Sequence, residues 1–120
     1  MILVDTSIWI DHLRSTDSQL AELLRLGQVL VHPFVTGEIS LGSIRQRQTV
    51  IQLLGFQRQA PLASHAEVMS LIEQERLHGL GIGLVDVHLL ASARSSGATL
   101  WTRDKRLDAI AARLGTRAEM

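Results

Sequence analysis

The sequence contains no cysteine, only two prolines and a single lysine, Lys105, and 3% of its residues are aromatic. Without cysteine the chain can form no disulfide, no thiolate zinc site and no cysteine nucleophile. No hydrophobic run approaches the ~20 residues that a membrane-spanning helix needs. Residues 1–5 do not combine a basic segment with a long apolar one, as a signal peptide would. These absences predict a cytoplasmic protein that does not enter a membrane.

The formal net charge is zero, from 12 basic and 12 acidic residues, and gives no argument for a nucleic-acid partner. The kind of basic residue is more informative, because every one except Lys105 is arginine. Arginine can bind phosphate through two parallel hydrogen bonds, which suits an RNA-binding protein. A GC-rich genome would produce the same bias, so composition leaves both explanations open.

What is present is an alternation of short apolar runs with amphipathic segments. The runs at residues 2–4, 29–31 and 98–102 are predicted to be buried, parallel strands. Helical apolar spacing fills most of the chain between and after them. Strands that alternate with helices predict an α/β fold, here a three-layer α/β/α domain with a mostly parallel central sheet. A chain of 120 residues is expected to form a single domain over residues 1–120.

Four carboxylates occupy places where such sheets bind ligands, beyond the carboxyl ends of the strands. Asp5 follows the first expected strand, and Asp104 follows the last one. Glu38 and Asp86 lie near the starts of helices that follow loops. All four side chains can therefore reach one edge of the sheet.

Each acid also has a purely structural explanation. Asp5 and Asp104 can cap the helices that follow them. Asp86 is favoured by a helix dipole, and Glu38 can lie on a solvated helix face. The surroundings favour a shared site, because the helix after Asp86 is too apolar for a surface element and Asp5 ends a strand without polar residues.

A shared site of this kind calls for a cation. Grouped carboxylates repel one another, and burial raises their pKa values. Hard oxygen ligands suit Mg²⁺ or Mn²⁺ better than zinc. Such a site is suited to phosphoryl transfer to an activated water. The residues therefore predict a divalent-metal site for phosphoryl transfer.

The same acids carry a resemblance to a known family. Four segments resemble, in order and in spacing, the four acidic motifs of PIN-domain ribonucleases: residues 4–7, 33–38, 84–91 and 100–104. The resemblance covers nearly the whole chain and extends to the VapC-type toxins of bacterial toxin–antitoxin pairs. It implies a PIN-like fold, with Asp5 and Asp86 as the principal metal ligands and with Glu38 and Asp104 completing an acidic pocket.

The resemblance has further implications for mechanism and partners. The hydroxyls of Thr6, Ser7 and Thr102 match the family's positions beside the first and last acids. The implied activity is a Mg²⁺-dependent endoribonuclease toxin that cuts structured RNA such as tRNA or ribosomal RNA loops. Hydrolysis would leave 3′-hydroxyl and 5′-phosphate ends. The implied partners are a second copy of the chain in a homodimer and a VapB-type antitoxin that covers the pocket.

Other side chains near the acids are weaker candidates. Arg103, Lys105 and Arg106 flank the last acid and are either RNA contacts or a solvated helix start. No histidine pair has metalloprotease spacing, so none is expected to be catalytic, and His32 is expected at the surface or its boundary. A partner surface can be formed by four apolar side chains: Trp9, Leu13, Leu20 and Leu24.

Two other classes of function compete with the nuclease. A catalytically silent PIN-like module that binds RNA or protein would be expected to lack one or more of the acids, and all four are present. A haloacid-type phosphatase needs a second aspartate where this chain has Ser7. A receiver domain needs paired acids where this chain has Thr6.

Overall fold

The structure, a computed structural model, describes residues 1–120 as seven helices around one four-stranded sheet. The strands are β1 (Ile2–Val4), β2 (Val29–Val31), β3 (Arg58–Gln59) and β4 (Thr99–Trp101). The helices are α1 (Thr6–Arg14), α2 (Ser18–Arg25), α3 (Pro33–Ser40), α4 (Arg47–Gly55), α5 (His65–Glu75), α6 (Leu84–Ser96) and α7 (Lys105–Arg113).

The sheet has the strand order β3-β2-β1-β4, and every pair is parallel. Leu3 of β1 pairs with Leu30 of β2 and with Leu100 of β4, and all three are buried. Three strands lie where the apolar runs predicted them. The fourth strand, β3, consists only of the exposed residues Arg58 and Gln59 at the sheet edge, so no apolar run in the sequence predicts it.

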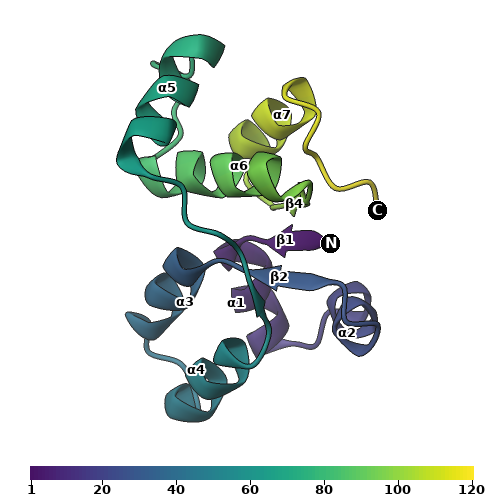
Figure 1. Ribbon diagram of the computed structural model, residues 1–120. Helices are drawn as coiled ribbons and strands as arrows, with labels where there is room; N and C mark the ends of the chain where they lie inside the picture. The colour runs from purple at the N-terminus through teal and green to yellow at the C-terminus, as the bar shows by residue number, and fades with distance from the viewer.

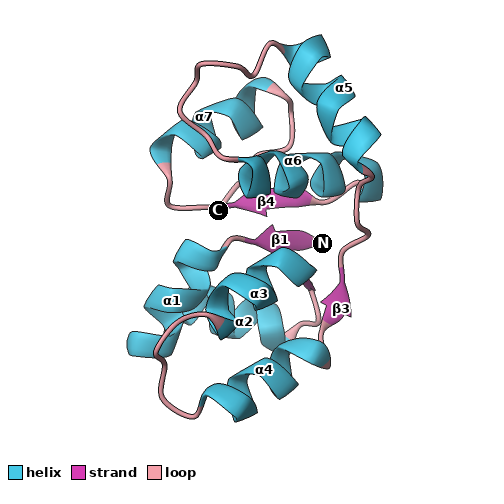
Figure 2. Ribbon diagram, turned by 90° about the vertical axis from the view of Figure 1, so that its left-hand side faces the viewer, coloured by secondary structure: helices cyan, strands magenta, loops and turns pink.

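Helices cover both faces of the sheet (Figures 1 and 2). Helices α1 to α4 lie on one side, and α5, α6 and α7 lie on the other. The predicted three-layer α/β/α architecture is confirmed. The two faces bury a single apolar core, whose largest fully buried side chains include Leu3, Ile8, Ile39, Leu89 and Leu107.

The end of the chain returns to the sheet beside β4. The Leu100 amide donates to the Thr116 carbonyl at 2.6 Å, and the Ala118 amide donates to the Leu100 carbonyl at 2.9 Å. Leu100 and Arg117 thereby form a single parallel bridge. The tail continues the parallel sheet by one bridge on the β4 side.

The connections define where a ligand would bind. From β1 the chain passes over the α1–α2 side to β2, and from β3 it passes over the α5–α6 side to β4. Strand order therefore reverses between β1 and β4, and the crevice beyond the carboxyl ends of two such strands is the usual ligand site of an open α/β sheet. The helices are all too short or too polar to cross a membrane.

His32 contradicts the expectation of a surface position, because its side chain is fully buried. Its Nδ1 accepts a hydrogen bond from the Phe34 amide at 2.9 Å and so caps α3. Its Nε2 lies 3.2 Å from the hydroxyl of Ser92, which donates to the carbonyl of Pro61. Nε2 must therefore carry the proton, and the imidazole is neutral when all these bonds are made.

Burial, with a smaller contribution from the positive charge of His88, lowers the pKa of His32 from 6.5 to about 4. As pH falls below 6.5 the unfolded chain takes up a proton that the folded chain refuses, so stability falls between pH 6.5 and about 4. The expected loss is about 3 kcal/mol. Urea unfolding across this range measures it.

His32→Asn is the matched control, because asparagine also caps helices but does not titrate. The variant should lose most of the pH dependence between 5 and 6.5. An unchanged slope would show that other groups set the acid sensitivity.

Candidate active site

Asp5 is the centre of the hydrogen bonds at the carboxyl ends of β1 and β4. It is 8% exposed, and its Oδ1 accepts from the Thr6 amide at 2.7 Å, which caps α1. Its Oδ2 accepts from the hydroxyls of Ser7 at 3.2 Å and Thr102 at 2.6 Å. Asp5 therefore caps α1, as its purely structural explanation predicted, and also belongs to the acidic group.

Thr102 connects the first acid to the last one. Its hydroxyl donates to Asp5 and accepts from the Asp104 amide at 3.1 Å. Asp104 is exposed and caps α7, with Oδ1 accepting from the amides of Arg106 and Leu107. Its other carboxylate oxygen makes no hydrogen bond within the protein. Asp104 is thus both a helix cap and a member of the acidic group.

Glu38 reaches the group from α3. Its side chain is exposed, and its Oε1 accepts from the Thr6 hydroxyl at 2.6 Å. Thr6 follows Asp5 directly, so one residue binds Asp5 through its amide and Glu38 through its hydroxyl. All three hydroxyls that the sequence singled out therefore contact an acid.

Asp86 lies in the first turn of α6, half-buried, and its Oδ2 accepts from the Gly83 amide at 2.9 Å. Burial raises the pKa of Asp86, the Gly83 bond opposes this, and the negative charges of Asp5, Asp104 and Glu38 raise it further. All three other acids thus lie close enough to repel Asp86. The structure brings the four carboxylates together at the edge where the sequence placed them.

The acids differ in exposure, because Asp5 is buried, Asp86 is half-buried, and Glu38 and Asp104 are exposed. The molecule has five surface hollows, and none is lined by any of these four residues. No three acidic or histidine side chains converge closely enough to surround a metal ion as they stand. The hydrogen bonds explain this, because each carboxylate is turned toward an amide or a hydroxyl.

The donor set nevertheless fits a hard divalent cation. It consists of carboxylate oxygens only, which suit Mg²⁺ or Mn²⁺. Glu38, Asp86 and Asp104 each keep one oxygen that makes no hydrogen bond within the protein. The repulsion at Asp86 is the kind of cost that a bound cation removes.

The three basic candidates beside the last acid differ from one another. Arg103 forms ion pairs with Asp11 and Asp17. Lys105 and Arg106 are exposed and form no ion pair. Only the latter two carry a charge that is free for a phosphate group.

Arg106 also shapes the loop before Asp86. Gly81 has φ +80°, and a Cβ atom there would collide with the Arg106 guanidinium. The left-handed backbone favours glycine at this position, whereas the flexible Arg106 side chain could shift to relieve the contact. The Arg106 side chain therefore lies over the loop that leads to Asp86, near the acidic group.

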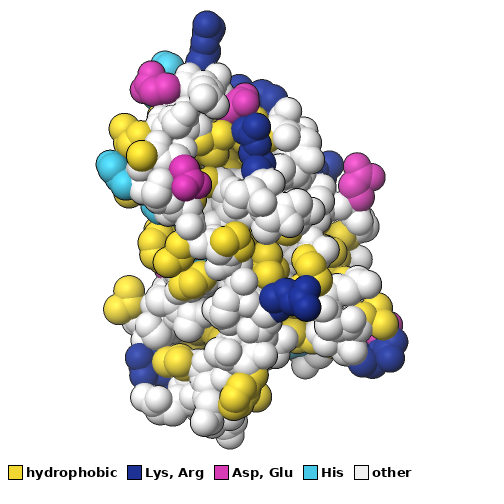
Figure 3. Space-filling model, viewed as in Figure 1, with side chains coloured by type: hydrophobic (Ala, Val, Ile, Leu, Met, Phe, Trp, Pro, Cys, Tyr) yellow, Lys and Arg dark blue, Asp and Glu magenta, His cyan; other side chains and the backbone are white.

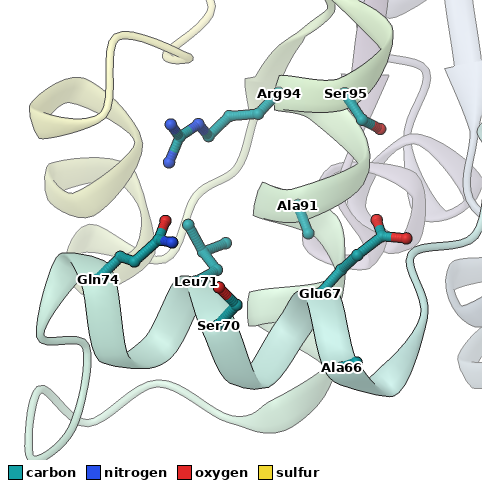
Figure 4. A pocket seen from close by; sticks show the side chains of 8 residues that line it. All are labelled: Ala66, Glu67, Ser70, Leu71, Gln74, Ala91, Arg94 and Ser95. Atoms are coloured by element: carbon teal, nitrogen blue, oxygen red, sulfur yellow. The ribbon is translucent and has the colours of Figure 1, made fainter.

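A hollow of about 510 Å³ lies away from the acids, between α5 and α6 (Figure 4). Glu67 and Gln74 of α5 and Arg94 of α6 are among its labelled side chains. Arg94 pairs with Glu75 at 3.4 Å. The hollow between α5 and α6 contains neither a cluster of acids nor a nucleophile with a base, so it offers no second candidate for catalysis.

Comparison with known proteins identifies the family to which the chain is similar. The PIN domain family model matches residues 2–113. Two curated relatives, both named Ribonuclease VapC32, come from Mycobacterium tuberculosis strains CDC 1551 / Oshkosh and ATCC 25618 / H37Rv. Each is 52% identical to this chain over 116 residues, which is 96% of the chain and 94% of the relative.

Solved structures share the fold at lower identity. The structure of FitAB bound to an IR36 DNA fragment superposes with a TM-score of 0.65 at 21% identity, over 93% of this chain and 91% of that one. PAE2754 from Pyrobaculum aerophilum gives a TM-score of 0.60 at 17% identity, over 97% and 96%. At these identities the likeness supports the fold alone.

Proposed function

Because the chain belongs to the PIN-domain family, and within it to the VapC-type ribonuclease toxins, we propose that it is a metal-dependent endoribonuclease toxin that hydrolyses phosphodiester bonds in structured RNA, such as tRNA or ribosomal RNA loops. The observation that carries the proposal is the gathering of Asp5, Glu38, Asp86 and Asp104 at the carboxyl ends of β1 and β4. The chain would act in the cytoplasm, where these RNAs are found.

Asp5 and Asp86 would be the principal ligands of Mg²⁺ or Mn²⁺, and Glu38 and Asp104 would complete the set. A bound divalent cation supplies an activated water and stabilises charge on the leaving oxygen. The residues of the chain supply orientation. Thr102 and Ser7 hold the Asp5 carboxylate by its Oδ2, and α7 holds Asp104 by its Oδ1.

The alternative is a silent PIN-like module that binds RNA or protein without cutting it. The full set of acids favours the enzyme, since a binding module has no use for four mutually repelling carboxylates. The deciding experiment incubates the purified protein with total RNA in Mg²⁺, in Mn²⁺ and in EDTA. Cleavage in either metal and none in EDTA supports the enzyme, and end mapping should give 5′-phosphate fragments. RNA binding without cleavage would support the silent module.

RNA contact is proposed for Arg106 and Lys105. Apart from the four site acids, the chain carries twelve basic and eight acidic residues, so the remaining surface is positive. On the face shown in Figure 3 the basic side chains are scattered singly and form no continuous stripe. Of the three basic residues beside Asp104, two form no ion pair, so few phosphate contacts are expected there and individual ones should have measurable effects.

Arg106→Gln is expected to weaken RNA binding severalfold and to reduce the slope of log K against log salt by about one phosphate contact. Filter binding in EDTA, between 50 and 200 mM salt, measures binding separately from cleavage. Arg94→Gln is the control, because Arg94 lies in the last turn of α6, away from the acids. If both variants bind like the wild type, Arg106 makes no phosphate contact.

The proposed partners are a VapB-type antitoxin and a second copy of the chain. Several large apolar side chains are exposed to solvent, including Leu41 at 88% and Phe56 at 76%. An apolar hollow of about 230 Å³ between α1, α2 and α4 is lined by Trp9, Leu13 and Leu24. Leu20, predicted with them, is fully buried in the core and is not part of this surface. Light scattering tests the dimer, and co-purification with the antitoxin tests the complex.

A further inference from the structure

Arg103 differs from its basic neighbours because its guanidinium is already held by two carboxylates from a distant part of the chain. Its Nε donates to Asp11 Oδ2 at 2.6 Å, and its Nη2 donates to Asp17 Oδ2 at 2.9 Å. Asp11 belongs to α1, and Asp17 caps α2 through the Leu20 amide at 3.0 Å. One positive charge between two negative ones leaves no surplus to attract a phosphate group.

The backbone of Arg103 is held as well. Its amide donates to the Ser7 hydroxyl at 3.2 Å, and that hydroxyl donates to Asp5. The residues on either side are Thr102, which donates to Asp5, and Asp104, which caps α7. Arg103 thus joins the connection between β4 and α7 to α1 and α2 at the point where two site acids meet.

We infer that Arg103 is a positioning residue: its clamp on Asp11 and Asp17 fixes the β4–α7 connection against α1 and α2, and so sets Asp104 and Thr102 relative to Asp5. The inference rests on the proposed function, because it assigns Arg103 to the geometry of the same site. It separates Arg103 from Lys105 and Arg106, which carry the free charges.

The clamp is expected to matter more for the orientation of the β4–α7 connection than for the stability of the fold. Exposed ion pairs contribute little to stability, and the Arg103 and Asp11 side chains are 45% and 48% exposed. The Asp17 side chain is only 18% exposed. The pKa of its carboxyl is lowered mainly by the hydrogen bond from the Leu20 amide, and also by the hydrogen bond from Arg103. A planar guanidinium that binds two carboxylates has a fixed orientation, which a lysine cannot reproduce. Small displacements of catalytic groups can cost up to about 100-fold in rate.

The test uses the fact that a clamp needs both Arg103 and its two acidic partners, whereas an RNA contact needs only the charge of Arg103. Arg103→Gln removes the cation. The double variant Asp11→Asn with Asp17→Asn keeps the cation but removes its partners, and asparagine preserves the α2 cap. Rates of cleavage of an RNA oligonucleotide in Mg²⁺ give kcat and KM for both variants, for the triple variant and for Arg103→Lys.

A clamp predicts that Arg103→Gln and the double variant each lower kcat about 10-fold with little change in KM. The triple variant should be no worse than either, because the same contact has been removed, and Arg103→Lys should recover only part of the loss. The inference is overturned if Arg103→Gln raises KM and flattens its salt dependence while the double variant, which frees the cation, lowers KM.

Hydrogen exchange of the Arg103 and Asp104 amides supplies a readout that does not depend on cleavage. The Arg103 amide donates to the Ser7 hydroxyl, and the Asp104 amide donates to the Thr102 hydroxyl. Both amides should exchange faster in Arg103→Gln and in the double variant, but not in Arg106→Gln. If the wild type cuts no RNA, the proposed function fails while the exchange result still decides the clamp. If the wild type cuts RNA and exchange is unchanged in the clamp variants, the clamp alone is refuted.

Discussion

Asp86→Asn is expected to reduce RNA cleavage by about 1000-fold or more, while its metal-free form unfolds at a higher temperature than the wild type. Loss of cleavage follows from removing a principal metal ligand, since a catalytic metal supplies several kcal/mol of transition-state stabilisation. The gain in stability follows from the raised pKa of Asp86, whose charge is opposed by burial and by three neighbouring carboxylates.

The sign of the pH dependence follows from the same shift. The folded chain holds the Asp86 proton more tightly than the unfolded chain, so folding is favoured most when Asp86 is protonated. The stability of the metal-free wild type should therefore fall as pH rises through the pKa of folded Asp86. Asp86→Asn should lack this contribution, and asparagine can still accept the hydrogen bond from Gly83.

Thermal unfolding in EDTA and in Mg²⁺ gives the second measurement. Mg²⁺ should raise the melting temperature of the wild type, because an ion that binds only the folded state stabilises it. The variant should gain little. Glu73→Gln, an exposed substitution on α5, is the control for loss of one acid. A variant that still cuts RNA and still responds to Mg²⁺ would remove Asp86 from the metal site.

The sheet and the acidic group could be predicted because both depend on local patterns. The runs at β1, β2 and β4 are apolar on both faces, and parallel strands must end at a common edge, so acids that follow them gather there. The strand β3 could not be predicted in this way. It has two residues, both polar and exposed, and it exists because β2 offers it free backbone groups.

The details of the site depend on contacts that no local pattern contains. Arg103 and its partners Asp11 and Asp17 are separated by 92 and 86 residues, and each alone resembles an ordinary surface charge. His32 looked like a boundary residue because its neighbours do not reveal that Ser92 lies 60 residues away to accept its proton. The different exposure of the four acids could not be predicted either, since it depends on which way each carboxylate turns.

Asp5→Asn is expected to abolish cleavage to the same extent as Asp86→Asn but to destabilise the protein. The two substitutions make the same chemical change in different surroundings. At Asp86 burial opposes the charge most strongly and the neighbouring acids add to it. Asp5 instead accepts three hydrogen bonds, from the Thr6 amide and from the hydroxyls of Ser7 and Thr102. Asparagine has one acceptor oxygen, so it cannot satisfy all three donors.

Whether Asp5→Asn stabilises or destabilises the protein depends on whether the lost hydrogen bond or the relieved repulsion is larger. An unsatisfied buried donor costs about 1–3 kcal/mol, and Thr102 is buried with its hydroxyl already committed to the Asp104 amide. Relief of the repulsion between Asp5 and Asp86 opposes this loss and is expected to be smaller, because Asp86 is only half-buried and solvent screens the two charges. The net expectation is a loss of about 2 kcal/mol, or about 8 °C in melting temperature for a chain of this size.

Differential scanning calorimetry in EDTA compares both variants with the wild type. Opposite shifts, upward for Asp86→Asn and downward for Asp5→Asn, would show that the two aspartates have different structural roles within one metal site. Thr102→Val separates the contributions further, since it removes the hydroxyl but leaves the Asp5 charge. Asp5→Asn as stable as Asp86→Asn would mean that repulsion, and not hydrogen bonding, dominates at Asp5.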